Sequence, residues 1–336
     1  MLQNAASRAG RFARQWDAGT PSNVGAARDP EPFFSRVIWR VILGVAIVIS
    51  TYWIAGFYLW PDAGNLFLDA HIYYQATATW LDGGNPWTTT YRGVPFAGIP
   101  PTLLLNVPLV PFGEQIAVAI WAVANTLAVI FIISRLRLPA WTLFLLPIVE
   151  GWLGASPDLA LAALLLAGGG WIAALTKPYS APVLVADRRW RQIAVAVVVG
   201  VITIPFLPWG LFYESRDLIA QTFARFAGYP LSASGNMVLL GLVALALISL
   251  GWRRGFILFT PGLVAQQPHY IVFSMEAVRW SRLLALAFTV PLPHAAAVGI
   301  VLYAVIDRLP SRDPPLEEVP LRPGDPRDIP IEVNQR

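Results

Sequence analysis

Cysteine is absent from this chain of 336 residues, and charged residues make up only 13% of it. Without cysteine the chain has no disulfide, no thiolate metal site and no cysteine nucleophile. The charged fraction is about half that of an ordinary soluble domain. Together with long apolar runs, this composition indicates a membrane protein.

Several motifs of well-known enzymes are also missing. There is no serine nucleophile elbow and no His-Glu metal motif. Gly168-Gly169-Gly170 lies inside an apolar run, so we interpret it as close helix packing and not as a phosphate-binding loop. No Asp-X-Asp pair occurs in the segments predicted to lie outside, which leaves a metal-bridged diphosphate site without its usual ligands. We therefore expect no metal and no other cofactor, and the absence of interleaved basic and aromatic residues argues against nucleic acid as a partner.

Long apolar runs recur from Val41 to Ile306, and 56% of all residues are hydrophobic. Runs of about 20 apolar residues are typical of transmembrane helices. The sequence therefore predicts an all-α fold, a polytopic transmembrane helix bundle of about eight spans, with a range of about seven to ten. The predicted spans cover residues 41–60, 114–134, 139–155, 158–176, 192–212, 236–251, 255–273 and 283–306.

The positive charges set the predicted orientation. Most of the 24 Lys and Arg residues fall on one side of these spans, and the positive-inside rule assigns that side to the cytoplasm. A polar N-terminal tail (1–36) and a Pro-rich C-terminal tail (307–336), expected to be disordered, are then cytoplasmic. Residues 37–306 form the transmembrane domain, whose first span is too far from the N-terminus for a signal peptide. The predicted location is the cell membrane, with multiple passes.

Residues 61–113 follow the first span and are predicted to be extracytoplasmic. A short helix is expected over 67–81, because Gly83-Gly84-Asn85-Pro86 stops it. The run 101–113 is too short to cross a membrane, and its prolines favour a re-entrant or interfacial segment.

Asp69 is the carboxylate at the start of this short helix. One interpretation is an N-cap, since Asp is favoured there. The other is a catalytic base, because a helix N-terminus also keeps a carboxylate ionised. Tyr73 lies one helical turn further on the same face and would place an aromatic wall beside the base, as sugar-binding sites often do.

Other ionisable residues are predicted near the outer membrane surface, where isolated charges are costly and therefore candidates for function. His269 follows Gln266-Gln267-Pro268 in span 255–273 and is either catalytic or structural. Lys177 precedes Pro178 and either snorkels at a kink or directs its charge at a phosphate. Arg279 and Arg282, in a short outer loop, either clamp an anion or anchor the chain at the interface. The last candidate for substrate binding is Arg216, in the outer loop 213–235.

A set of motifs occurs in one order along residues 40–300 and resembles the GT-C glycosyltransferases, most closely family 87, the polyprenyl-phosphate-mannose-dependent mannosyltransferases. The motifs are Asp69-Ala-His-Ile-Tyr73-Tyr74, Gly83-Gly84-Asn85-Pro86-Trp87, Pro100-Pro101, Pro108-Leu-Val-Pro111, Lys177-Pro178-Tyr179, Ser234-Gly235-Asn236 and Pro268-His269-Tyr270.

The resemblance implies a hexosyltransferase that moves a sugar, mannose in that family, from a polyprenyl-phosphate donor to a lipid or glycan acceptor on the extracytoplasmic face. Asp69 would be the general base, His269 an active-site residue near the donor phosphate, and Lys177 a donor-side residue. Direct displacement inverts the anomeric centre. The partners implied are membrane lipids, the lipid-linked sugar donor and the acceptor.

Two alternatives remain open. A transporter or lipid flippase would also use broken helices near charged residues, although no internal repeat is evident. A degenerate, non-catalytic relative would not bring Asp69 and His269 together in the fold.

Overall fold

The computed structural model describes residues 33–59, 65–226 and 230–308, and within these ranges the chain is mostly helical, as the sequence predicts. Residues 1–32 and 309–336, which form most of the two predicted tails, lie outside the described residues. The helices are α2 (Phe33–Tyr58), α3 (Leu68–Leu81), α4 (Glu114–Leu136), α5 (Leu146–Leu153), α6 (Pro157–Leu164), α7 (Gly170–Thr176), α8 (Ala181–Ala186), α9 (Trp190–Thr203), α10 (Trp209–Glu214), α11 (Arg216–Phe226), α12 (Met237–Ser249), α13 (Trp252–Ile257), α14 (Arg282–Thr289) and α15 (Ala295–Arg308).

Three helical segments are long and apolar enough to cross a membrane: Val37–Tyr58, Glu114–Leu136 and Pro157–Thr176. They coincide with three of the predicted spans. The first two are single helices, α2 and α4. Many large apolar side chains on their surfaces are exposed, such as Val48 at 67% and Leu127 at 62%, and a bilayer would cover such surfaces.

The third segment is bent back on itself. Its two α-helices, α6 and α7, are joined by a π-helical turn in which Gly168 has φ +102°, a backbone conformation that side-chain-bearing residues rarely adopt. The Asp158 carboxylate and the Lys177 amino group, one at each end, lie 3.3 Å apart. A straight helix would separate their backbones by about 28 Å. This segment is therefore a hairpin and not a straight rod.

Prolines break four of the other five predicted spans into shorter pieces, because proline cannot donate the backbone hydrogen bond that continues a helix; span 236–251 contains no proline. The sequence predicted a membrane-spanning helix in each of these segments, and the structure has shorter helices in their place. Span 139–155 becomes a 3₁₀ turn and α5, span 192–212 becomes α9 and α10, and span 236–251 holds only α12. Span 255–273 becomes α13, a π-helical turn over Thr260–Val264 and a 3₁₀ helix, η9 (Pro268–Arg279), and span 283–306 becomes α14 and α15.

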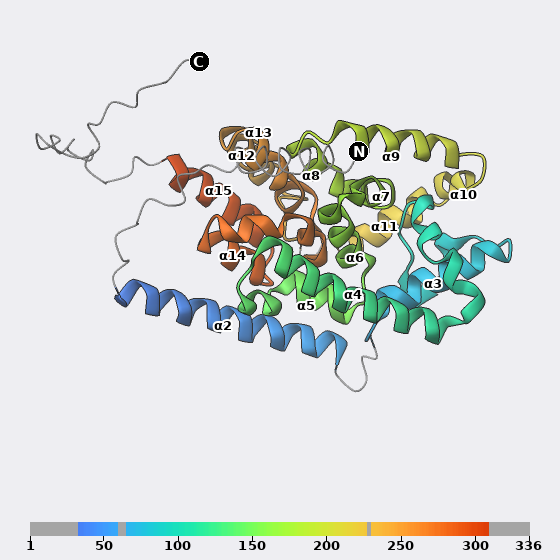
Figure 1. Ribbon diagram of the computed structural model, residues 1–336, viewed down its shortest axis with the longest axis horizontal. Coiled ribbons are helices and arrows are strands. Elements are labelled where there is room, and N and C mark those ends of the chain that lie inside the picture. Colours follow the sequence, from blue (N-terminus) through green and yellow to red (C-terminus); the bar gives the residue numbers. More distant parts are fainter. Residues whose placement is uncertain (1–32, 60–64, 227–229, 309–336) are drawn as a thin grey trace, which may run out of the picture.

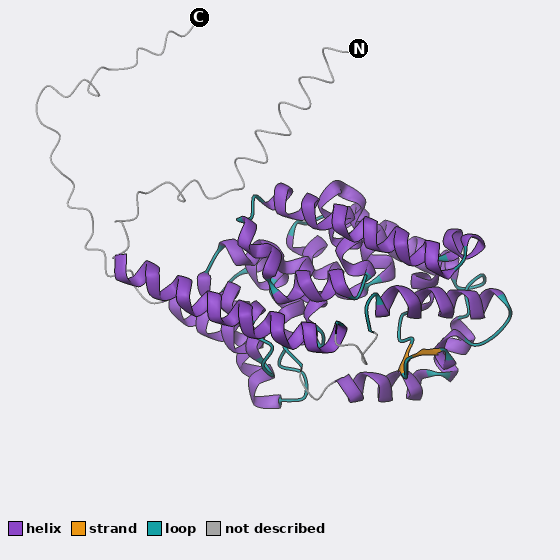
Figure 2. Ribbon diagram, turned by 90° about the horizontal axis from the view of Figure 1, so that it is seen from below, coloured by secondary structure: helices purple, strands orange, loops and turns teal. Residues whose placement is uncertain are grey.

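The predicted short helix over 67–81 is confirmed as α3, within one residue. The following turn leads into a two-stranded antiparallel hairpin, β1 (Thr90–Tyr91) and β2 (Val94–Pro95), which the sequence did not predict. The predicted re-entrant run 101–113 forms two short 3₁₀ helices, Pro100–Leu105 and Val107–Phe112. Figure 2 shows this small hairpin among helices at one end of the molecule.

The end of the molecule opposite α3 carries arginines that form ion pairs. Figure 1 places α3 at one end and the start of α2 and the end of α15 toward the other. At this second end, called the basic end below, Arg254 pairs with Asp307 at 2.9 Å and Arg253 pairs with Glu276 at 2.8 Å. The sequence placed Arg253 inside and the loop that follows span 255–273, with Glu276, outside. That prediction is wrong, because η9 runs back from the middle of the molecule to Arg253.

Candidate active site

Asp69 lies in the first turn of α3, and the start of this helix is docked on the end of α5. The backbone amide of Phe67 donates to the Leu153 carbonyl at 2.7 Å, and that of Asp69 donates to the Gly154 carbonyl at 2.9 Å. The N-cap position belongs to Phe67, so the interpretation of Asp69 as the cap is wrong. Its place in the first turn still gives its carboxylate the favourable end of the helix dipole.

His269 is held by Glu150 through two hydrogen bonds. Both its backbone amide, at 2.8 Å, and its Nδ1, at 2.7 Å, contact Glu150 Oε2. The Tyr58 hydroxyl donates to Oε1 of the same carboxylate at 3.3 Å. A proton on Nδ1 is therefore fixed toward Glu150, and Nε2 is left to face the rest of the site.

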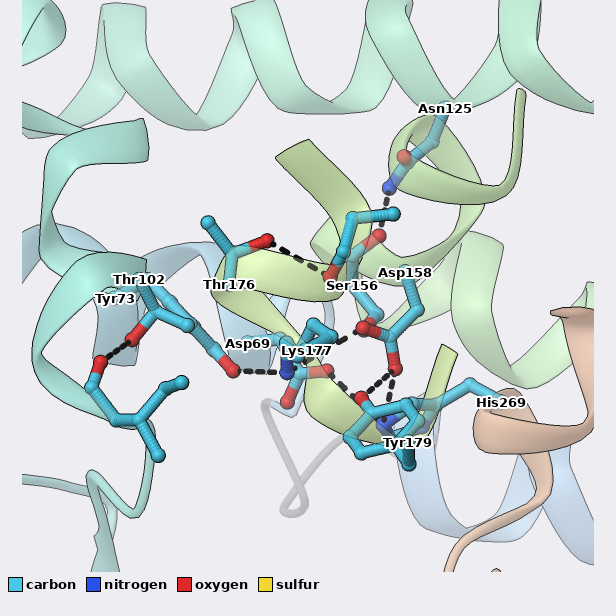
Figure 3. A network of polar contacts seen from close by, with 12 residues as sticks. Asp69, Tyr73, Thr102, Asn125, Ser156, Asp158, Thr176, Lys177, Tyr179 and His269 are labelled. Atoms are coloured by element: carbon cyan, nitrogen blue, oxygen red, sulfur yellow. Dashed lines mark hydrogen bonds and ion pairs between the residues drawn. The ribbon is translucent and has the colours of Figure 1, made fainter. Parts of the chain in front are cut away.

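Two further carboxylates lie on the Nε2 side of His269. Asp158 Oδ2 is 3.5 Å from Nε2, and Asp69 Oδ2 is 4.0 Å away. The side chains of His269 and Asp158 are 4% and 0% exposed, whereas that of Asp69 is 20% exposed. Of these three groups, Asp69 is therefore the most exposed (Figure 3 labels all three).

Lys177 completes the group on the other side of Asp158. Its amino group lies 3.3 Å from Asp158 Oδ1 and donates a hydrogen bond to the Tyr73 hydroxyl. The Tyr179 hydroxyl donates to Asp158 Oδ2 at 2.6 Å. Figure 3 shows these side chains meeting between α3, α6 and η9. We call Asp69, Glu150, Asp158, Lys177 and His269 the charged cluster.

The electrostatics of the cluster bear on how Asp69 can act. Burial raises the pKa of the Asp69 carboxyl above its ordinary value; His269 opposes this shift, and Glu150 adds to it. Burial also raises the pKa of the neighbouring Tyr73 hydroxyl to about 12, so Tyr73 is neutral at pH 7. A carboxylate with a raised pKa is, in its ionised form, a stronger base than an ordinary aspartate.

The structure brings together four of the seven predicted site residues: Asp69, Tyr73, Lys177 and His269. The other three do not join them. Arg216 pairs with Asp217 at 3.7 Å on α11, where its side chain is 78% exposed. Arg279 is exposed at the far end of η9, about 20 Å from His269 at the rise of a 3₁₀ helix, and Arg282 follows it at the start of α14. The predicted anion clamp therefore lies away from Asp69.

Glu150 and Asp158 were expected among the isolated charges near the outer membrane surface but were given no role, and Tyr179 was not predicted as a site residue. The two carboxylates carried a usable signal, since each stands alone in an apolar segment. Tyr179 follows Lys177-Pro178, but nothing in the sequence pairs its hydroxyl with Asp158. Among the described residues, no group of three or more His, Asp or Glu side chains is arranged to hold a metal ion.

Comparison with known proteins adds no relative: no protein-family model, no curated protein and no solved structure matches this chain.

Proposed function

We propose that this chain is an integral-membrane hexosyltransferase of the GT-C type, which moves a hexose, mannose by its resemblance to family 87, from a polyprenyl phosphate to a lipid or glycan acceptor. The observation that carries the proposal is the convergence of Asp69 and His269, which are 200 positions apart in the chain and 4.0 Å apart in space. The degenerate alternative predicts that they stay separate. The motifs around these two residues are also the ones that carry the resemblance.

In the proposed reaction Asp69 is the general base. It takes the proton of the acceptor hydroxyl while that oxygen bonds to C1 of the sugar. The bond between C1 and the phosphate oxygen breaks, and its electron pair leaves with the polyprenyl phosphate. A positioned base contributes about 10²- to 10⁴-fold to such a rate. Attack opposite the leaving phosphate inverts C1.

The other members of the cluster keep Asp69 effective. Glu150 orients His269, whose Nε2 faces Asp69 and, when protonated, stabilises its negative charge. Lys177 is 6% exposed and already bound to Asp158 and Tyr73, so we assign it to supporting Asp158 and not to direct donor contact.

We further propose that the chain is a polytopic protein of the cell membrane, with the α3 end outside and both termini cytoplasmic. The arginines of the basic end support this orientation. Helices α2 and α4 cross completely. Several of the other predicted spans would enter and return from one side, because helices of 14 residues, such as α9 and α15, reach only about 21 Å of a 30 Å hydrocarbon core.

A direct test uses purified protein, radiolabelled polyprenyl-phosphate-mannose and a total membrane-lipid extract as acceptor. The proposal predicts a labelled glycolipid of inverted anomeric configuration, with no transfer from a sugar nucleotide. Label that stays on the donor under all conditions, with folded protein present, would contradict it.

A transporter remains the second candidate, because Asp158 and Lys177 are buried at the meeting ends of a broken helix. Transporters often bind substrates at such breaks. Movement of labelled lipid across a vesicle membrane without any glycosidic product would favour this function.

A further inference from the structure

An open apolar groove runs between α12 and α13, close to the basic end and away from the charged cluster. Its volume is about 400 Å³, within the range of sites for small ligands. The walls are formed mainly by Leu247, Ile248, Trp252, Phe256, Phe259 and Leu263. Beside the groove, Leu245 is 67% exposed and Ile248 is 77% exposed, so the groove opens onto a surface that a bilayer would cover.

Two glycines shape one end of the groove. Gly251 has φ +77°, which allows the chain to reverse between α12 and α13. A Cβ at Gly255 would lie 2.5 Å from the Leu247 carbonyl oxygen, so the two helices meet closely at this point.

The same end of the groove carries tryptophans and unpaired arginines. The Trp252 indole donates to the Val185 carbonyl at 3.0 Å, and its ring lies 6.3 Å from that of Trp190. Arg188 and Arg191 flank Trp190 in the chain and are exposed. Across residues 33–59, 65–226 and 230–308, neither has an acidic partner, whereas Arg189 pairs with Asp187.

We propose that this groove binds one acidic phospholipid, with an acyl chain along the apolar walls and the phosphate held by Arg188 and Arg191. Tryptophans prefer the level of lipid headgroups, and arginines beside a membrane attract anionic lipids. Along the groove, the apolar walls come first, then the tryptophans, and then the two arginines. A phospholipid has its parts in the same order: acyl chain, interfacial region and phosphate. This inference rests on the membrane setting of the proposed function but not on its transferase chemistry.

The test places photoreactive p-benzoylphenylalanine at Phe259 of the full-length protein, reconstituted in vesicles of equal parts phosphatidylglycerol and phosphatidylcholine. Mass spectrometry of the irradiated protein should show adducts mainly of phosphatidylglycerol. The double substitution Arg188→Gln/Arg191→Gln should lower this preference about fivefold for each arginine at low salt. Arg40→Gln, an exposed arginine of α2 toward the same end, is the matched control and should keep the preference.

A second pair of variants tests the chain-binding walls. Ala244→Trp fills the groove and should abolish the adduct, whereas Leu245→Trp, on the next residue but outside the groove, should keep it. Any of three results would overturn the proposal. These are equal adducts of both lipids without the arginine substitutions, an undiminished preference in the double variant, and a crosslink to residues 309–336 or to a second copy of the chain. Asp69→Asn should leave the lipid adduct unchanged, so failure of the transferase proposal would be seen separately.

Discussion

The ion pair between Asp158 and Lys177 offers a quantitative test of the hairpin that builds the site. Their side chains are 0% and 8% exposed, so water screens the pair very little. Replacement of Lys177 by methionine keeps most of the apolar stem and removes the charge. Asp158 would then remain buried without its cation, which is the costly outcome for a buried pair.

The size of the effect follows from what remains around Asp158. Breaking a buried pair costs about 3–5 kcal/mol. Asp158 keeps the Tyr179 hydroxyl at 2.6 Å and His269 at 3.5 Å, so we expect the lower end, about 3 kcal/mol. With roughly 2 °C per kcal/mol for a large chain, Tm should fall by about 6 °C. The double variant Asp158→Asn/Lys177→Met should regain most of this loss, because no unpaired charge is left.

The assay is thermal unfolding of the detergent-solubilised protein, followed by tryptophan fluorescence. Arg216→Met is the control, since it breaks an ion pair whose side chains are 78% and 86% exposed, and such pairs contribute little. A Lys177→Met variant as stable as the unsubstituted protein, or a double variant no better than the single one, would refute the reasoning.

Two further predictions concern the base and the bend. Because burial raises the pKa of Asp69 and the base acts in its ionised form, the transfer rate should fall on acidification with a midpoint above 4, the ordinary value for an aspartate; a pH–rate profile that is flat down to pH 4 would contradict this. Gly168→Ala should lower the stability of the solubilised protein by about 1–2 kcal/mol, because alanine is strained at φ +102°. Gly44→Ala in α2, where an added Cβ meets nothing within 4 Å, should not. Equal Tm values for these two variants would contradict the claim that alanine is strained at position 168.

Local signals predicted local structure well. The helix α3 was placed within one residue, because Asp82 to Pro86 forms a turn whose residue types stop a helix at a definite point. The membrane character followed from composition and run length. Both properties depend on residues close together in the sequence.

The sequence did not predict how the apolar runs fold back. Prolines such as Pro205 and Pro268 indicate breaks, but not whether the chain continues across the membrane or reverses. Glu276 was therefore predicted to lie on the opposite side of the membrane from Arg253, although the two form an ion pair. For the same reason, Arg279 was predicted to lie in the site but lies away from it.

Only part of the charged cluster was predicted, because some of its contacts join residues far apart in the sequence. Asp69 and His269 were expected to meet because both were placed at one membrane surface. Glu150 holds His269 across 119 positions and Tyr58 across 92, and no periodicity in the sequence encodes such pairings. Long-range partners of this kind become visible only in the folded chain.

The central claim is that Asp69 is the base of a sugar transfer, and one rate measurement tests it most directly. Purified Asp69→Asn protein is compared with Asp217→Asn, an exposed aspartate on α11, in single-turnover transfer from polyprenyl-phosphate-mannose to membrane lipid. We predict a loss of about 10²- to 10⁴-fold for Asp69→Asn and no loss for Asp217→Asn, with both proteins equally abundant in membranes. An Asp69→Asn rate equal to that of the control would contradict the proposed role.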